Sequence, residues 1–442
     1  MKKFNDLCES RFLKLFFAFV SLCFLVAAFV MPDRANAFSG LWNILTNPTK
    51  LSTNFFDVGG FAGTFLNMGL VALVMTFLFV VTRTVVNNVS SLAFFLTLGF
   101  TTWGINVLNM WFVIPGVVVA NLIKKEKPFA NVNAMLFATG AAPFVSEMLF
   151  RYPHAEVVGF NALGLVLALV VGFVIGMLVL SGIPHSPNVH KGMNLLSAGL
   201  PVGMTTFLLN GVFYKAMGIE VPGAVGDVKV ANAMAVNVFC IALFALFVIL
   251  GLLLGCKPKD YWQVLKSRSQ VANLSGTRNV GVYLVNLGIT GLFILGYYNA
   301  IGANLNGVVF GLIFCVMSCT NSGSRPTNIW PIMLGYVVAA FGFEALSGLL
   351  GGAFAMKINT AAVAVGLCYA TGLTPICDKY GWLFGTCAAV VHFCIVTLVP
   401  SLHGGFCLYN GGFTGVLVCI ILVPVFEKFF KTKEERMLAK AK

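Results

Sequence analysis

Apolar segments of about 20 residues follow one another along almost the whole chain, and each is long enough to cross a bilayer as a helix. Of the 442 residues, 59% are hydrophobic and only 10% are charged, whereas about 25% of residues are charged in a soluble chain. A water-soluble domain could not cover its surface with so few charges, which excludes soluble enzymes and nucleic-acid-binding proteins. We therefore expect an all-α, polytopic membrane protein with the lipid bilayer as its first partner.

Eight segments are continuous candidates for membrane-spanning helices: 13–31, 61–81, 160–180, 193–213, 231–254, 280–298, 382–399 and 406–425. Two further segments are apolar but interrupted, at 128–150 and 358–378. Two regions consist of paired apolar arms: 90–103 with 107–123, and 303–319 with 329–350. The first arm of each pair is short for a full crossing at about 1.5 Å per residue, so re-entrant and spanning arms both stay open.

The first apolar segment has two interpretations. It follows Lys2 and Lys3 and precedes Ala35-Asn36-Ala37, as a secretory signal with a small-residue cleavage site would. The alternative is an uncleaved first spanning helix, which we favour for a protein that crosses the membrane repeatedly.

The positions of the positive charges predict the orientation, because Lys and Arg stay on the cytoplasmic side. One topology places every cluster of positive charges in the cytoplasm. Of the 28 Lys and Arg residues, it puts 21 on the cytoplasmic side and six on the outer side, and Arg325 lies within the second arm pair. The formal net charge of +13 therefore reflects orientation in a bilayer. We expect a multi-pass protein of the bacterial inner membrane with both termini in the cytoplasm.

Three motifs occur in the same order in both halves of the chain. G-x-x-x-x-N-[IM]-W begins at Gly104 and Gly323, [FY]-A-T-G-x-x-P at Phe137 and Tyr369, and H-x-G at His190 and His403. Their offsets are 219, 232 and 213 residues. Such ordered self-similarity indicates a duplicated unit.

The predicted topology starts the first unit outside and the second inside, because segment 231–254 adds one crossing between them. Inverted repeats of this kind are a transporter architecture; a duplicated bundle without a pathway is the alternative. The chain then divides into an N-terminal helix with an outer loop, the first repeat, a linker with the inverting helix and a basic loop, the second repeat, and a basic tail. These are 1–54, 55–215, 216–277, 278–428 and 429–442.

The A-T-G-x-x-P motif falls near the middle of the two interrupted segments. Glycine weakens a helix and proline removes one of its hydrogen bonds, so we interpret both copies as discontinuous helices with polar backbone near the midplane, where solutes bind. The alternative is a pair of packing kinks. The candidate pathway residues are Thr139, Gly140, Pro143, Thr371, Gly372 and Pro375.

The junctions between the arms are polar and supply further candidates. Asn328 is a suitable N-cap, and Arg325 adds a charge three residues before it. A helix N-terminus with a cation beside it suits an anionic solute. The first repeat has Asn106 and Asn109 at these positions, so the site would carry charge from one half only. The alternative is that Arg325 lies in a cytoplasmic turn.

A few polar residues within apolar segments complete the set. His392 is a candidate for proton coupling, with a hydrogen-bonded neutral imidazole as the alternative, and Asn410 is a candidate pathway group. We expect Glu147 and Asp378, at the far ends of the interrupted segments, to lie at the membrane interface. No spacing fits a metal site, so we expect no cofactor and no catalytic residues.

The doubled [FY]-A-T-G-x-x-P and G-x-x-x-x-N-[IM]-W motifs resemble those of a bacterial membrane family whose domain of unknown function occurs in tandem copies. That resemblance covers nearly the whole chain and implies no substrate. A fainter resemblance is to urea channels, whose halves are also inverted. The stretch from Gly405 to Gly415 fits their G-x-x-x-[YF]-N-x-x-φ-x-G pattern. The first half lacks the pattern, since Leu196 and Ser197 replace the aromatic residue and the Asn.

Together these patterns predict a secondary transporter or channel that moves a small polar or anionic metabolite through a midplane site. A passive pore for a small neutral solute is the nearest alternative. A membrane-embedded enzyme and a non-transporting assembly protein are alternatives of other classes. The sequence leaves a homo-oligomer open.

Overall fold

The computed structural model describes residues 2–51, 53–223, 233–267, 272–354 and 356–441, and these ranges are helical and contain no strand. Within them, nine helices are long and apolar enough to cross a membrane. They are Asp6–Val30, Phe55–Val81, Val132–Phe150, Ala162–His190, Ala233–Leu253, Val280–Ala300, Pro326–Leu349, Ala361–Tyr380 and Asn410–Lys440. The protein is therefore an all-helical, multi-pass membrane protein.

The helices of the first half begin at the N-terminus of the chain. They are α1 (Lys2–Val30), α2 (Ala37–Leu45), α3 (Phe55–Val81), α4 (Asn88–Phe100), α5 (Ile114–Ile123), α6 (Val132–Ala138), α7 (Ala142–Phe150), α8 (Ala162–Gly182), α9 (Ser186–His190) and α10 (Gly199–Asn210). The predicted linker 216–277 includes 224–232 and 268–271, which lie outside the described residues. Its described helices are α11 (Ala233–Leu253), α12 (Pro258–Leu265) and α13 (Leu274–Thr277).

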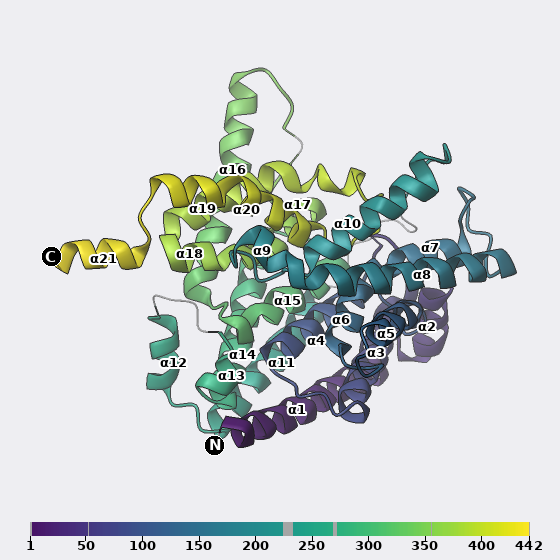
Figure 1. The fold of residues 1–442 in the computed structure, drawn as a ribbon, viewed down its shortest axis with the longest axis horizontal. Helices are drawn as coiled ribbons and strands as arrows, with labels where there is room; N and C mark the ends of the chain where they lie inside the picture. The colour runs from purple at the N-terminus through teal and green to yellow at the C-terminus, as the bar shows by residue number, and fades with distance from the viewer. Residues whose placement is uncertain (1, 52, 224–232, 268–271, 355, 442) are drawn as a thin grey trace.

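The second half begins with a long helix of 21 residues and a short one of 12, as the first repeat begins with helices of 27 and 13 residues. Its helices follow in chain order. They are α14 (Val280–Ala300), α15 (Gly307–Ser318), α16 (Pro326–Leu349), α17 (Ala361–Ala370), α18 (Thr374–Tyr380), α19 (Trp382–Val396) and α20 (Asn410–Phe429), with α21 (Lys433–Ala441) after them. In Figure 1 the N-terminal end of α1, α12 and α21 lie toward the left, and α16 projects at the top.

The predicted interruptions are present in both halves, in a mild form. A 3-10 turn over Thr139–Ala141 separates α6 from α7, and one over Thr371–Leu373 separates α17 from α18. A proline stands in the first turn of each following helix, where its missing N–H costs no internal bond. Each interrupted helix is thus two short helices joined by a tighter turn.

The prediction of a continuous helix over 193–213 is wrong, because α10 begins only at Gly199. The stretch before it forms hydrogen bonds with the other half. The Leu195 N–H donates to the Gly372 carbonyl, and the Asn194 side chain donates to the Gly412 carbonyl. These two hydrogen bonds attach the stretch before α10 to the opposite half.

The two halves meet through equivalent helices, since α4 packs on α15 and α10 packs on α20. Residues at the same place in each repeat touch at both crossings. The Cys315 thiol lies 3.8 Å from the Leu96 carbonyl oxygen, at the 219-residue offset. At the 213-residue offset, a Cβ on Gly199 would lie 2.5 Å from the Gly412 carbonyl carbon. Contacts between equivalent residues are those that a two-fold relation between the halves produces.

Glycine at the α4–α15 crossing permits this close approach, which yields a prediction. A Cβ at Gly311 would lie 2.2 Å from the Gly99 carbonyl oxygen, so Gly311→Ala must push the halves apart. We expect a loss of about 1–3 kcal/mol, measured as a fall of several degrees in the thermal unfolding midpoint in detergent. The control is Gly342→Ala on the exposed part of α16, where the space is open. Equal stability of the two variants would contradict the tight crossing.

Candidate functional site

The two interrupted helices exchange hydrogen bonds with the opposite halves. The Gly140 carbonyl oxygen accepts from the Leu408 N–H at 2.9 Å, and the Gly372 carbonyl oxygen accepts from the Leu195 N–H at 2.8 Å. These residues correspond at the 232- and 213-residue offsets. Each half therefore satisfies a carbonyl at the interruption of the other.

In this conformation both interruptions are closed by side chains. A Cβ on Gly140 would lie 2.2 Å from the Tyr409 ring, and one on Gly372 would lie 2.6 Å from Asn194 Oδ1. The Tyr409 hydroxyl is buried and has no hydrogen-bond partner among the described residues. The backbone that was predicted to bind solute is thus covered. An aromatic ring covers it at Gly140 and an amide covers it at Gly372, because the two halves differ in sequence at the covering positions.

The predicted hydroxyl donors are also occupied within the protein. Thr139 Oγ1 donates to the Leu136 carbonyl and Thr371 Oγ1 to the Cys368 carbonyl, each at 2.5 Å. Both residues are buried. They stabilise the 3-10 turns here, and a solute would reach them only in another conformation.

The arm junctions are held by hydrogen bonds that recur between the halves. Asn109 Oδ1 accepts from the Asn106 N–H, as Asn328 Oδ1 accepts from the Arg325 N–H, both at 2.9 Å. Asn328 is the third residue of α16 and Arg325 the N-cap, so the prediction that Asn328 itself is the N-cap is wrong. The reason is that Pro326 fits the first helical position.

The halves differ in the group that the second amide hydrogen meets. Asn109 Nδ2 donates to Ser146 Oγ at 2.9 Å, whereas Asn328 Nδ2 donates to Asp378 Oδ2 at 2.9 Å. Ser146 and Asp378 correspond at the 232-residue offset. The second half therefore has a carboxylate where the first has a hydroxyl.

That carboxylate forms a buried, two-pronged ion pair with Arg325. The guanidinium nitrogens lie 2.8 Å and 3.2 Å from the two Asp378 oxygens, and the same nitrogens donate to the Gly323 and Ser267 carbonyls. Arg325 Nε is buried without a partner among the described residues. Asp378 is 6% exposed, so its carboxylate is enclosed by the protein, and its expected position at the membrane interface stays a prediction.

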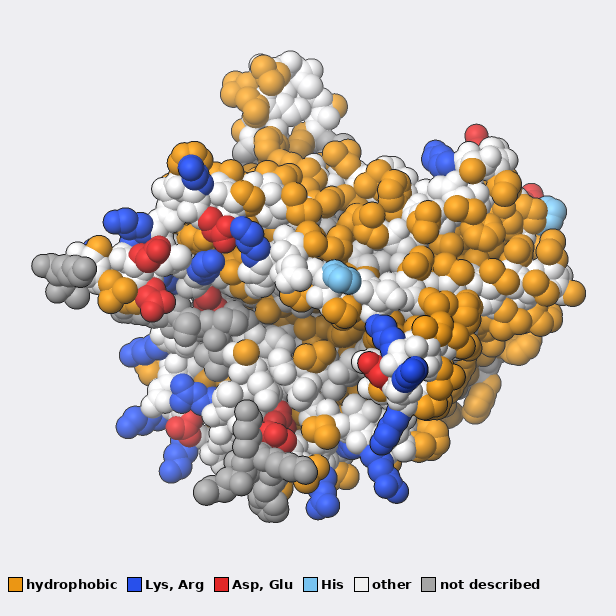
Figure 2. Space-filling view, viewed as in Figure 1, with side chains coloured by type: hydrophobic (Ala, Val, Ile, Leu, Met, Phe, Trp, Pro, Cys, Tyr) orange, Lys and Arg blue, Asp and Glu red, His pale blue; other side chains and the backbone are white. Residues whose placement is uncertain are grey.

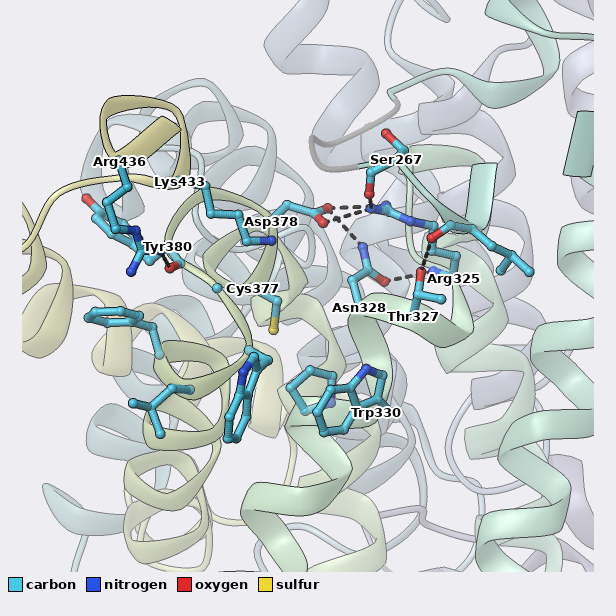
Figure 3. Close-up of a pocket in the computed structure, with 16 residues that line it drawn as sticks. Ser267, Arg325, Thr327, Asn328, Trp330, Cys377, Asp378, Tyr380, Lys433 and Arg436 are labelled. Atoms are coloured by element: carbon cyan, nitrogen blue, oxygen red, sulfur yellow. Dashed lines mark hydrogen bonds and ion pairs between the residues drawn. The ribbon is translucent and has the colours of Figure 1, made fainter. Parts of the chain in front are cut away.

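A cavity of about 550 Å³ opens beside this ion pair. Figure 3 shows Asp378 facing Arg325 and Asn328, with Lys433 extending from α21 toward Asp378 and Arg436 beside Tyr380. Trp330 and Trp382 stack in its wall with ring centroids 5.8 Å apart. The cavity thus combines an aromatic wall with three cationic groups and one carboxylate.

Glu147 forms a different ion pair, at the end of the first interrupted helix. Arg151 binds both of its oxygens, at 2.7 Å and 2.8 Å, and the Tyr214 hydroxyl donates to it at 3.1 Å. Lys50 lies over the Phe406 ring, and burial lowers the pKa of Lys50 to about 8. Glu147 is fully buried, and its expected position at the membrane interface also stays a prediction.

The remaining candidates are hydrogen-bonded inside the bundle. His392 Nε2 donates to the Gly411 carbonyl at 2.8 Å, and its Nδ1 lies 2.7 Å from the Tyr336 hydroxyl oxygen, so both ring nitrogens have a partner inside the bundle. Asn410 Oδ1 accepts from His403 at 3.0 Å. Within the described ranges, no group of three or more His, Cys, Asp or Glu side chains could hold a metal ion.

A family model described as "Protein of unknown function (DUF1576)" matches residues 33–215 and 257–428. The chain belongs to this family. The two tandem matches fit a domain of unknown function that occurs twice in the chain, in agreement with the repeated motifs. No curated protein and no solved structure matches the chain. The family is described as one of unknown function, so its match gives no substrate.

Two features of the site were not identified from the sequence. The pairing of Arg325 with Asp378 had a usable signal: both positions are charged in the second half and neutral in the first, at Asn106 and Ser146. Two substitutions of opposite charge in one copy of a repeat indicate a contact. Lys433 and Arg436 gave no such signal, because they belong to a tail whose charges indicate only orientation.

The first half supplies a neutral version of this site, which yields a prediction. Asp378→Ser alone leaves the buried Arg325 charge unpaired, which costs about 3–5 kcal/mol. The double variant Arg325→Asn with Asp378→Ser copies Asn106 and Ser146, and Asn is a good N-cap. We expect the single variant to lose most of its thermal stability in detergent and the double variant to recover most of it. A single variant as stable as the wild type would refute the pairing.

Proposed function

We propose that the protein is a secondary transporter or channel of a bacterial inner membrane that moves a small polar or anionic metabolite between two inverted halves. The observation that carries the proposal is the exchange of hydrogen bonds at Gly140 and Gly372. It supports transport because the interruptions bring polar backbone to the middle of two membrane helices, at the contact between the halves. Transporters bind solutes at such interruptions.

The arrangement of equivalent helices supports the inverted orientation. In Figure 1, α7 lies toward the right and α18 toward the left, near α12 and α21. In Figure 2, Lys, Arg, Asp and Glu side chains gather over the left and lower parts of the same face, and hydrophobic side chains cover the upper right. Since positive charges favour the cytoplasm, the left side would be cytoplasmic, with both chain termini there.

The proposed path is shut at its centre in this conformation. The Tyr409 ring fills the space beside Gly140, while the cavity at Arg325 lies at the charged end of the molecule. Passage of a solute would require the halves to separate at both interruptions. The two exchanged hydrogen bonds would then break and re-form in each cycle, as one half moves against the other.

The cavity beside Arg325 favours an anion over a neutral solute, because its lining holds three cations and one carboxylate. A passive pore for neutral molecules needs no buried guanidinium, and such a charge is costly to retain within a membrane protein. We propose no chemical step, because every buried carboxylate described above is paired with an arginine.

The experiment is flux through the purified protein reconstituted in liposomes, with inorganic phosphate, succinate, lactate and urea as solutes. We expect flux of at least one anion. Gly140→Ala should reduce that flux at least tenfold, because the added methyl group clashes with the Tyr409 ring. The control is Gly296→Ala on α14, where a Cβ meets nothing within 4 Å.

Each outcome of the flux experiment decides between the proposals. Flux of urea alone would replace this proposal with the neutral-solute pore. A folded protein that passes none of the four solutes would contradict transport of this class. Equal flux in Gly140→Ala and Gly296→Ala would show that the path avoids the interruption.

A further inference from the structure

The charged groups of the cavity at the charged end of the molecule come from three separate parts of the chain. Arg325 comes from the start of α16, Asp378 from α18, and Lys433 and Arg436 from α21. The helix α21 follows the last long apolar helix after a short non-helical stretch. The tail therefore contributes side chains to the same cavity as the repeat motifs, instead of only marking the cytoplasmic side.

The charges in this cavity do not balance. Its lining contains three cations and, as the one carboxylate, Asp378. The lining therefore has a net charge of +2. Asp378 is already bound on both oxygens by Arg325. Among the described residues, no carboxylate lies within ion-pair distance of Lys433 or Arg436.

The acidic residues of α21 do not correct this imbalance. Glu435 accepts from the Thr432 N–H and so caps the start of its own helix. Glu434 lies in the lining of a neighbouring cavity, on the other side of Lys433. Arg436 donates to the Tyr380 carbonyl and lies 5.9 Å from the Phe384 ring, and neither contact neutralises its charge.

One buried donor in the cavity lining also lacks an acceptor. Arg325 is 1% exposed, and its Nε has no hydrogen-bond partner among the described residues. A buried donor without a partner costs about 1–3 kcal/mol, so an oxygen atom brought by a ligand would stabilise it. Arg325, the residue that carries this orphaned donor, lines the same cavity as the two unpaired cations.

We propose that this cavity binds a small anion of the carboxylate or phosphate class, with Lys433 and Arg436 of the C-terminal helix as ligands beside Arg325. Two negative charges match the excess of two positive charges. The volume of about 550 Å³ fits a small metabolite. The inference names the solute class at one end of the proposed path and so rests on the proposed function.

The same chemistry is present in free metabolites and in the headgroups of anionic lipids. The stacked Trp330 and Trp382 in the wall are residues that favour membrane interfaces, so both sources reach this level of the molecule. The experiment must therefore separate a soluble anion from a lipid phosphate.

The experiment measures binding of inorganic phosphate and of succinate to the purified full chain by isothermal titration calorimetry. We expect saturable binding of at least one. Lys433→Gln and Arg436→Gln should each weaken it about tenfold. Lys431→Gln is the matched control, because it removes the same charge from an exposed position outside this cavity. The double variant Arg325→Asn with Asp378→Ser removes the guanidinium donors but keeps the excess of two positive charges, so it should weaken binding without abolishing it while the protein stays folded.

A second arm identifies the source of the anion. The titrations are repeated in nanodiscs of phosphatidylcholine and of phosphatidylglycerol. If phosphatidylglycerol weakens phosphate binding in the wild type but not in Lys433→Gln, the lipid headgroup occupies the cavity. If the two lipids give the same affinity, the ligand is the free anion. Either result supports an anion site, and the arm only decides its source.

The proposal is overturned if neither anion binds, or if Lys433→Gln, Arg436→Gln and Lys431→Gln bind equally well. Because binding is measured without flux, the two proposals fail separately. A protein that binds the anion but transports nothing keeps this site and loses the transport function. Flux that is insensitive to Lys433 and Arg436 keeps transport and loses this site.

Discussion

The contact between the halves depends on carbonyl groups that the helices cannot satisfy themselves. At Gly140 and Gly372 a 3-10 turn and the proline after it disrupt the regular ladder, and unpaired backbone deep in a bilayer costs several kcal/mol. The other half supplies the missing donor in both cases, from Leu408 and Leu195. Neither half could therefore satisfy its own interruption alone, so the duplicated units must assemble face to face.

The two halves share the same hydrogen-bonded scaffold, and the candidate binding site lies where their side chains differ. The frame of amide hydrogen bonds at Asn109 and Asn328 is the same in both halves, whereas charge appears only in the second, as Arg325 with Asp378. The second half has a polar cavity beside this charged pair, where the first half has the neutral Asn106 and Ser146. Lys433 and Arg436 of α21 add to that end only, which gives the molecule a direction that two identical halves would lack.

Local pattern was sufficient to predict most of the long helices, the short first arms and the interruptions. α4 and α15, of 13 and 12 residues, are short as the apolar stretches indicate, and glycine and proline identify the interruptions. Contacts between distant segments were not predictable in this way. The apolar stretch 193–213 has the composition of a helix, but its first residues bond to the other half, and hydropathy carries no record of that. Asp378 was expected at the interface because a carboxylate at a helix end is usually solvated, and only its partner Arg325 explains its burial.

The central claim is that the two units face opposite ways in the membrane, and equivalent residues can test it directly. Lys215 and Lys428 correspond at the 213-residue offset, end the α10 and α20 regions, and are both exposed. In a background without the native cysteines, Lys215→Cys and Lys428→Cys are each treated with a membrane-impermeant thiol reagent on intact and on permeabilised cells. The account predicts that position 215 reacts in intact cells and that position 428 reacts only after permeabilisation. Reaction of both positions from the same side would contradict it.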